Sequence, residues 1–278
     1  MTDSGVRYGA VLPAGTAPEQ LEQAELAERA GWDGVFSWET AYGVDPWTLL
    51  AAIAARTSRV KLGTILTPLP FRRPWKVASQ VATLDQLSGG RAILAVGVGA
   101  VDTELPDTGE ETDLKVRAAK LDEGIDLIQT VWSGGGRYDG EHYHYDSGRS
   151  DLAASARPVQ QPIPLWVAAR WPRPKSLCRA LRCQGILPEI MPEGREQEPE
   201  DLRVLRAWLA EHGAPDNMDV VIDGETPADD PDGAAVQVKA WADAGATWWL
   251  ETRWGMADSQ AERIQAMTER LAAGPPRS

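Results

Sequence analysis

Short apolar stretches alternate along the whole chain with longer segments in which apolar residues recur every three or four positions. The short stretches predict strands, and those that are apolar on both faces are typical of a parallel sheet covered by helices. The longer segments predict amphipathic helices. The expected strands are 6–12, 34–39, 60–67, 91–99, 164–169, 185–191, 219–223 and 248–254, each followed by a helix.

Eight such units predict a (β/α)8 TIM barrel, with residues 1–278 forming one domain. The alternative is a doubly wound open sheet, which normally has fewer strands. The stretch from Tyr138 to Tyr145 falls outside the repeat, after the fourth helix, and predicts a hairpin around Asp139-Gly140. At the start of the first helix, Thr16 and Glu19 match a capping box.

The stretch from Thr83 to Gly99 contains the clearest indication of a ligand site. One face of its strand becomes smaller along its length, through Ile93, Ala95, Gly97 and Gly99. Barrels bind ligands at the carboxyl ends of their strands, where these two glycines would lie. Relief of crowding inside the barrel explains the glycines equally well, so the strand alone leaves both interpretations open.

Composition narrows the classes of partner. The net charge of −13 argues against nucleic acid and anionic membranes, which would repel the chain at long range. The sequence has neither an apolar run of roughly 20 residues nor a signal-peptide pattern, so we expect a cytoplasmic protein. Cys178 and Cys183 do not share a helix face, and we interpret them as reduced packing residues.

Several charged residues follow predicted strands and are candidates for chemistry. Glu39 is a candidate general base whose pKa Trp38 and other apolar neighbours would raise, although a solvated loop carboxylate fits as well. Glu251 and Arg253 lie on one face of the last strand, and for Glu251 an internal ion pair is the better interpretation. No Ser-His-Asp order or nucleophile elbow is present.

Arginines are the candidates for phosphate binding, because an acidic protein must place cations beside that group. Arg170 and Arg253 follow late strands, where barrels commonly bind phosphate. Arg72 and Arg73, after the third strand, are further options. Each of the four also fits a solvated surface charge.

A metal-dependent hydrolase is a remaining alternative. It would use Glu189, Asp223 and Glu225 together with His142 and His144, which alternate along the predicted hairpin. Without a third ligand placed beside the two histidines, an exposed polar edge is favoured, and we expect no metal site.

Four stretches carry a resemblance that covers nearly the whole chain: Ala30–Glu39, Leu62–Gly99, Lys120–Trp132 and Gly245–Glu251. Through them the chain resembles the bacterial-luciferase-like family of flavin- and deazaflavin-dependent oxidoreductases. The resemblance implies a (β/α)8 barrel with the cofactor ring in its mouth, against the third and fourth strands. It also implies a non-prolyl cis peptide, which would map to Thr64-Ile65.

The resemblance also implies roles for single residues. Besides Trp38, Thr64 and Ile65, the ring would contact a backbone opened by Gly97 and Gly99. The family's phosphate site would map to Ala168, Ala169 and Arg170, with Arg253 as a further cofactor-binding candidate. These ten residues, with Glu39 as the catalytic one, form the expected site: Trp38, Glu39, Thr64, Ile65, Gly97, Gly99, Ala168, Ala169, Arg170 and Arg253.

One position departs from the resemblance. Many relatives have a histidine after the acidic residue of the second strand, where this chain has Thr40. Glu39 or a substrate group would therefore have to move the proton. A non-catalytic barrel is a further alternative that this departure suggests.

The cofactor expected first is FMN, reduced by a separate flavin reductase, for monooxygenation of an apolar or aromatic molecule. The alternative is coenzyme F420, with hydride transfer to or from an organic substrate. The acid-rich stretch from Asp102 to Asp113 favours FMN slightly, because a long deazaflavin tail would require a cationic groove. Family members are often dimers, and apolar residues on the outer helices would permit a homodimer.

Overall fold

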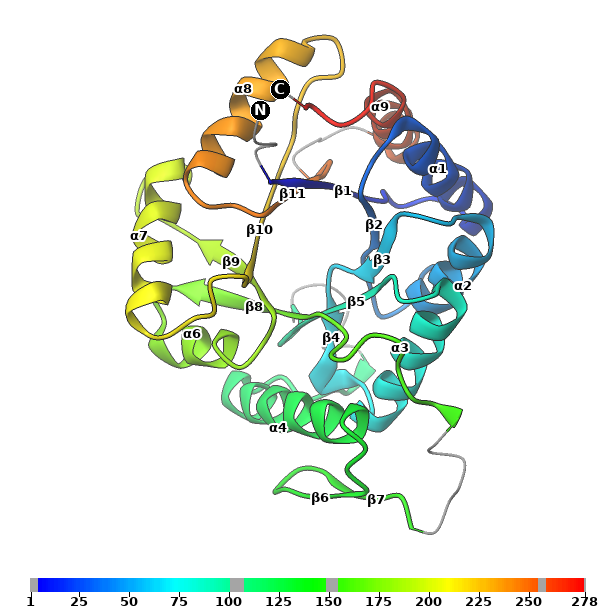
Figure 1. Ribbon diagram of the computed structural model, residues 1–278, viewed down its shortest axis with the longest axis vertical. Coiled ribbons are helices and arrows are strands. Elements are labelled where there is room, and N and C mark those ends of the chain that lie inside the picture. Colours follow the sequence, from blue (N-terminus) through cyan, green and yellow to red (C-terminus); the bar gives the residue numbers. More distant parts are fainter. Residues whose placement is uncertain (1–4, 101–107, 149–154, 255–258, 278) are drawn as a thin grey trace.

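The computed structural model describes residues 5–100, 108–148, 155–254 and 259–277. Its strands pair in the order β3-β2-β1-β11-β10-β9-β8-β5-β4, and β3 also pairs with β5, so the parallel sheet closes into a barrel (Figure 1). The barrel strands are β1 (Arg7–Val11), β2 (Gly34–Ser37), β3 (Lys61–Thr64), β4 (Thr67–Pro68), β5 (Ala92–Gly97), β8 (Leu165–Trp171), β9 (Gly185–Ile190), β10 (Asp219–Gly224) and β11 (Trp248–Glu251). The predicted TIM barrel is confirmed, and the open-sheet alternative is wrong.

A ring of α-helices surrounds the barrel (Figure 1). The described helices are α1 (Ala17–Ala30), α2 (Pro46–Arg56), α3 (Pro74–Ser88), α4 (Leu114–Trp132), α6 (Pro174–Ala180), α7 (Pro199–Glu211), α8 (Pro231–Asp243) and α9 (Gln260–Ala272). The predicted capping box is present at α1, where the Thr16 hydroxyl and the Glu19 carboxylate satisfy each other's backbone N–H groups. No described helix has both the length and the apolar composition that a membrane crossing requires.

The predicted hairpin is also present. The strands β6 (Arg137–Asp139) and β7 (His144–Asp146) pair antiparallel and extend beyond α4, away from the barrel (Figure 1). The Glu123 carboxylate of α4 accepts hydrogen bonds from three backbone N–H groups of the turn, those of residues 141–143. This carboxylate therefore anchors the hairpin to the barrel.

Aromatic rings fill the interior of the barrel near the amino-terminal ends of the strands. Trp166 lies with its ring centroid 5.4 Å from that of Phe36 and 5.4 Å from that of Trp248. A Cβ atom at Gly34, which lies on β2 together with Phe36, would come within 2.9 Å of the Phe36 ring and 3.0 Å of the Trp248 ring, so this packing requires glycine there. Trp248 packs this interior, whereas Trp249, the next residue, packs in the core between the strands and the helices.

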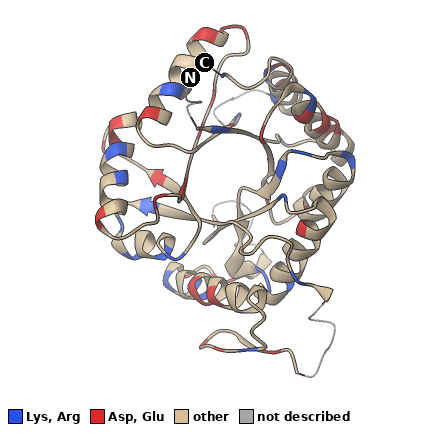
Figure 2. Cartoon of the chain, viewed as in Figure 1, with Lys and Arg blue, Asp and Glu red and all other residues tan. Residues whose placement is uncertain are grey.

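Around the barrel, a larger apolar core lies between the strands and the helices. Figure 2 places both signs of charge mainly on the surrounding helices and loops. Neither cysteine forms a disulfide, since Cys178 is exposed and Cys183 is buried with a free thiol. Burial raises the pKa of the Cys183 thiol to about 12, which suits an unreactive packing residue.

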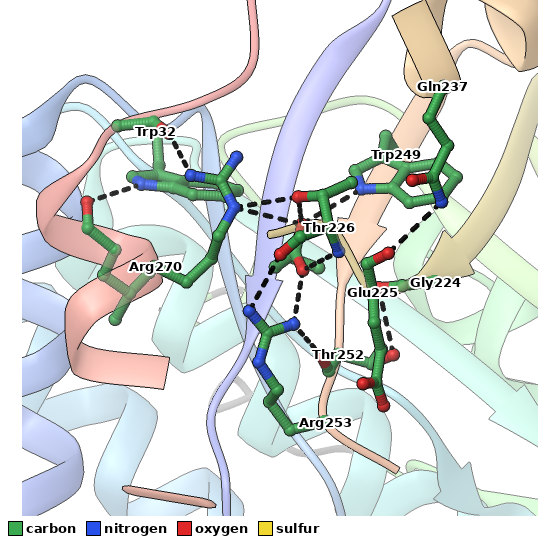
Figure 3. Close-up of polar contacts among 12 residues, drawn as sticks. Trp32, Gly224, Glu225, Thr226, Gln237, Trp249, Thr252, Arg253 and Arg270 are labelled. Carbon is green, nitrogen blue, oxygen red and sulfur yellow. Dashed lines mark hydrogen bonds and ion pairs between the residues drawn. The ribbon is translucent and has the colours of Figure 1, made fainter. Parts of the chain in front are cut away.

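One charged cluster is buried between the barrel and its helices, where β11 meets α9 (Figure 3). The fully buried Glu251 carboxylate accepts hydrogen bonds from the backbone N–H of Thr226 at 2.7 Å and from its hydroxyl at 2.6 Å. It also lies 2.5 Å from Arg253 Nη1 and 3.6 Å from Arg270 Nε. The expected internal ion pair is confirmed, and it joins the last strand to the last helix.

We predict that Glu251→Gln lowers the free energy of unfolding by about 3–5 kcal/mol, because two buried guanidinium groups lose their counter-charge. Urea unfolding measures the change. The matched control is Glu200→Gln, which removes an exposed ion pair with Arg203 on α7 and should cost less than about 1 kcal/mol. A loss below about 1 kcal/mol for Glu251→Gln would contradict a supporting role for the cluster.

Candidate functional site

A cavity of about 900 Å³ opens at the carboxyl ends of the strands. This is the end of the barrel at which TIM-barrel enzymes carry their active sites, and the volume suits a cofactor-sized ligand. Its described lining residues come from the ends of β2, β5, β8 and β9, from the β3–α3 connection, and from loops: Trp38, Glu39, Thr40, Ala41, Ile65, Leu66, Pro68, Phe71, Arg72, Gly97, Val98, Gly99, Ala100, Thr108, Glu110, Ala168, Glu189 and Trp254.

The buried acid of this cavity is Glu39, two residues after β2. Its side chain is only 5% exposed and forms an ion pair with Arg72, whose Nε lies 2.5 Å from Oε1. Arg72 Nη2 also lies 3.7 Å from Asp45 Oδ2. Because Arg72 already has two carboxylate partners, the prediction that it is a free phosphate ligand is not supported.

The two oxygens of Glu39 have different surroundings. Oε1 meets the guanidinium, whereas Oε2 is buried without a hydrogen-bond partner among the described residues. Burial raises the pKa of the Glu39 carboxyl above its ordinary value, and the Arg72 charge offsets part of that rise, as does the nearby Thr67 hydroxyl, which donates its own hydrogen bond to Thr64. A carboxyl that is buried, cavity-lining and half-satisfied can bind or release a proton at Oε2.

The β3–β4 junction forms one wall of the cavity. The non-prolyl cis peptide is present there, but it joins Ile65 to Leu66, one bond later than the predicted Thr64-Ile65. Thr64 belongs to the regular part of β3, and its buried hydroxyl donates to the Ala95 carbonyl at 3.2 Å. Ile65 and Leu66 therefore line the cavity. Thr64 is not among the lining residues, so its predicted contact with the cofactor is not supported.

Gly97, the last residue of β5, and Gly99, two residues after it, both line the cavity and are close-packed. A Cβ atom at Gly97 would come within 2.9 Å of the Leu66 side chain. Gly99 has a φ of +77°, and a Cβ atom there would lie 2.5 Å from the Phe71 ring. Protein atoms thus explain both glycines by crowding, the interpretation that the sequence left open, while the prediction that a ring approaches them is untested.

The end of β8 separates three of the predicted phosphate-binding residues. Ala168 lines the cavity, whereas Ala169 packs in the core between the strands and the helices. Arg170 is exposed, its Nη2 lies 3.3 Å from Met191 Sδ, and its backbone N–H donates to Ser176 Oγ. Of these three residues, only Ala168 therefore lines the cavity. Arg170 forms no ion pair with any residue that the structure describes.

The remaining predicted cations lie elsewhere. Arg253 lines a smaller neighbouring cavity of about 270 Å³ together with Trp38 and Trp254, and its charge is compensated by Glu251. Arg73 is exposed, with its guanidinium carbon 5.9 Å from the centre of the Trp75 ring. Neither belongs to the lining of the main cavity.

The arrangement required for the metal-dependent alternative is not assembled among the described residues. His142 Nδ1 lies 2.8 Å from Glu123, whereas His144 Nδ1 lies 2.6 Å from Asp139. The described group that could hold an ion is Glu123 of α4 with Glu141 and His142 of the hairpin turn, outside the barrel. Its Glu123 oxygens are already used by the hairpin turn.

Some of the residues that shape the cavity were not predicted from the sequence. Leu66 and Phe71 cover β5, and Arg72 fixes the proposed acid Glu39. The signal for the ion pair was available, because β2 and β3 are neighbours in the predicted barrel and their following loops meet. The covering of β5 required knowing where β3 is interrupted, which no periodicity shows.

Comparisons of the sequence with known proteins identify several similar enzymes. A segment of 163 residues is 36% identical to the F420-dependent glucose-6-phosphate dehydrogenase of Amycolatopsis mediterranei, over 55% of this chain and 47% of that protein. The enzyme of the same name from Beutenbergia cavernae is 31% identical over 91% of this chain and 84% of its own length. The oxygenase component of a flavin-dependent trigonelline monooxygenase from Acinetobacter baylyi is 30% identical over 55% of this chain and 43% of its own length.

Several of these matches are partial, and the chain spans about half the length of most of the curated relatives it matches first. Among solved structures, an F420-dependent secondary alcohol dehydrogenase aligns with a TM-score of 0.73 at 18% identity, over 96% of this chain and 98% of its own, which shows a common fold. The family model for luciferase-like monooxygenases matches residues 3–274. The chain therefore belongs to the luciferase-like monooxygenase family.

Proposed function

We propose that this protein is a coenzyme F420-dependent oxidoreductase that acts on a small organic molecule in the barrel mouth. The observation that carries the proposal is the wide cavity over β3–β5 with the buried Glu39–Arg72 pair at its edge. The relatives whose names specify F420 favour this coenzyme over FMN, which the sequence analysis placed first.

The residues present fit such a coenzyme. Apolar walls from Ile65, Leu66 and Phe71 suit one face of a planar ring, and Glu39 Oε2 needs a partner that the described protein does not supply. When bound, F420 would supply hydride transfer to or from an organic substrate. The apolar walls would exclude water from the reacting atoms.

Glu39 is the residue we assign to proton movement. Arg72 holds Oε1 and so fixes the orientation of the carboxyl, leaving Oε2 to exchange a proton with the substrate. The raised pKa keeps the protonated form available closer to neutral pH than for a solvated glutamate. In this assignment Glu39 takes over the proton transfer that a histidine would perform, since this chain has Thr40 where many relatives carry a histidine.

The anionic tail of the coenzyme requires cations, and the β8 side of the mouth supplies them. Arg170 lies near the end of β8, and Arg173 lies directly before α6. The acid-rich stretch between Asp102 and Asp113 belongs to the connection after β5. We infer that the tail leaves the cavity along β8, where these two arginines supply positive charge.

A second candidate is monooxygenation with reduced FMN and oxygen. The trigonelline monooxygenase relative supports it, and a separate flavin reductase would then be a partner. The two candidates differ in the cofactor bound, so binding distinguishes them before any substrate is known.

Titration of the protein with F420 and with FMN tests the proposal. We predict micromolar binding of F420 and binding of FMN at least tenfold weaker, with tryptophan fluorescence as the readout. Arg170→Met should weaken F420 binding about three- to tenfold, because an ion pair to phosphate at an exposed site is lost. Arg203→Met, on the outer surface of α7, is the matched control and should leave binding unchanged.

Tighter binding of FMN would favour the monooxygenase candidate. Binding of neither cofactor by the folded protein would contradict both candidates and would support the non-catalytic alternative. Equal binding by the wild type and Arg170→Met would contradict only the proposed path of the tail.

The Glu39 assignment makes a separate prediction about pH. Since the pKa of Glu39 is raised in the folded state, the unfolded chain loses this proton at lower pH, and folding stability decreases as pH rises from about 4.5 through the folded pKa. Glu39→Gln lacks this titration. We predict that the unfolding free energy of the wild type minus that of Glu39→Gln falls across this interval, by about 1.4 kcal/mol for each unit of pKa shift.

Urea unfolding of both proteins between pH 4 and pH 8 measures the difference. Asp223, whose pKa is also raised by the surrounding protein, titrates in both proteins and cancels. A difference that rises with pH would mean that the Arg72 charge outweighs burial, and Glu39 would then be a permanent carboxylate unsuited to holding the proton.

A further inference from the structure

One buried arginine lies directly behind the cavity wall at the end of β5. Arg117, near the start of α4, is 4% exposed, and its Nη1 donates to the carbonyl oxygens of Val98 at 3.0 Å and Gly99 at 2.7 Å. Its guanidinium carbon lies 5.9 Å from the centre of the Phe71 ring. Val98, Gly99 and Phe71 all line the cavity, so the guanidinium contacts the lining from behind.

The charge of Arg117 is not compensated nearby. The side chain forms no ion pair with any residue that the structure describes, and its buried Nε has no hydrogen-bond partner among them. The carboxylate of Asp113, which caps the start of α4, is exposed and accepts hydrogen bonds from the backbone N–H groups of Lys115 and Val116. Because an arginine side chain stays protonated in proteins, an uncompensated positive charge lies behind the wall.

A second buried arginine without an ion pair in the described part of the chain shows what a structural role requires. The guanidinium of Arg91, just before β5 at the opposite end of the barrel, donates hydrogen bonds to four carbonyl oxygens and to the Thr57 hydroxyl. The described hydrogen bonds of Arg117 come from Nη1 alone. A buried guanidinium with an unused donor is costly to the fold, and its place behind the mouth favours a role toward negative charge there.

The carboxylates that line the mouth are either paired or exposed to water. Glu39 is held by Arg72, and the exposed Glu189 is the cross-strand neighbour of Arg170 in the register of β8 and β9. Glu110 is also exposed. Water and salt screen exposed charges strongly, whereas a buried charge acts on its surroundings with little screening. The buried guanidinium therefore acts directly on a ligand that lies over the end of β5.

We propose that Arg117 stabilises the reduced form of the coenzyme ring over β5 and so raises the reduction potential of the bound coenzyme. The proposal deepens the proposed function and rests on it. When a substrate reduces the coenzyme, a substrate C–H bond breaks, a ring C–H bond forms with both electrons, and the O–H or N–H proton of the oxidised substrate passes to Glu39. The ring gains one negative charge, which a buried cation favours. Arg117 acts through the wall and is a positioning residue.

The two oxidation states of F420 test the proposal, because a change in reduction potential equals a change in the ratio of their dissociation constants. Each form is titrated anaerobically into the protein at pH 8, with tryptophan fluorescence as the readout. Arg117→Met removes the charge, and Arg117→Gln removes it while keeping an N–H donor for the two carbonyl oxygens. Each should lower the ratio of the oxidised to the reduced dissociation constant about tenfold, or about 30 mV for a two-electron couple.

Two further variants separate charge from structural support. Arg117→Lys keeps the charge and should leave the ratio within about threefold of the wild type. Arg91→Met removes a buried arginine at the far end of β5, so it should lower the free energy of unfolding and leave the ratio unchanged.

The inference is overturned if both neutral variants weaken the two forms of F420 equally, or if Arg117→Lys lowers the ratio as much as Arg117→Met. If the wild type binds neither form of F420, the proposed function fails. The same ratio measured with FMN, whose ring also gains negative charge on reduction, then decides the role of Arg117. Binding of neither cofactor would overturn the inference together with the proposed function.

Discussion

Close packing of three aromatic rings at the amino-terminal end of the barrel is the constraint on which the rest depends. Phe36, Trp166 and Trp248 come from strands far apart in sequence, and their contacts fill the space that the parallel strands of the barrel enclose. Glycine at position 34 leaves room for them. With that end closed, the open volume lies at the opposite end, where the loops place the polar groups of the mouth.

The sequence was sufficient for the architecture because periodicity reports burial, and burial in a parallel barrel is nearly continuous along each strand. Its information on the site was less complete. The interruption between β3 and β4 moved the cis bond to Ile65-Leu66, and strand alternation turned Ala169 toward the helices. Whether Arg72 would meet Glu39 or a ligand depended on loop geometry, which hydrophobic patterning does not encode.

The two buried carboxylates Glu251 and Glu39 show how a structural charge differs from a candidate functional one. Around Glu251, two arginines, a hydroxyl and a backbone N–H satisfy the carboxylate on both oxygens, which suits a fixed structural link. Around Glu39, a single arginine satisfies one oxygen and leaves the other without a partner at the cavity edge. Incomplete satisfaction of a buried group is costly, and its position in the mouth is consistent with a role in binding or proton transfer.

The central claim is that the deazaflavin ring of F420 occupies the mouth over the β3–β4 junction and the end of β5. A crystal structure of the protein with F420 tests it most directly. The account predicts the ring against Ile65, Leu66 and Gly99, with Glu39 at the open side and the phosphate beside Arg170. A ring bound at another face of the barrel, or a tail lying along the acid-rich connection after β5, would contradict it.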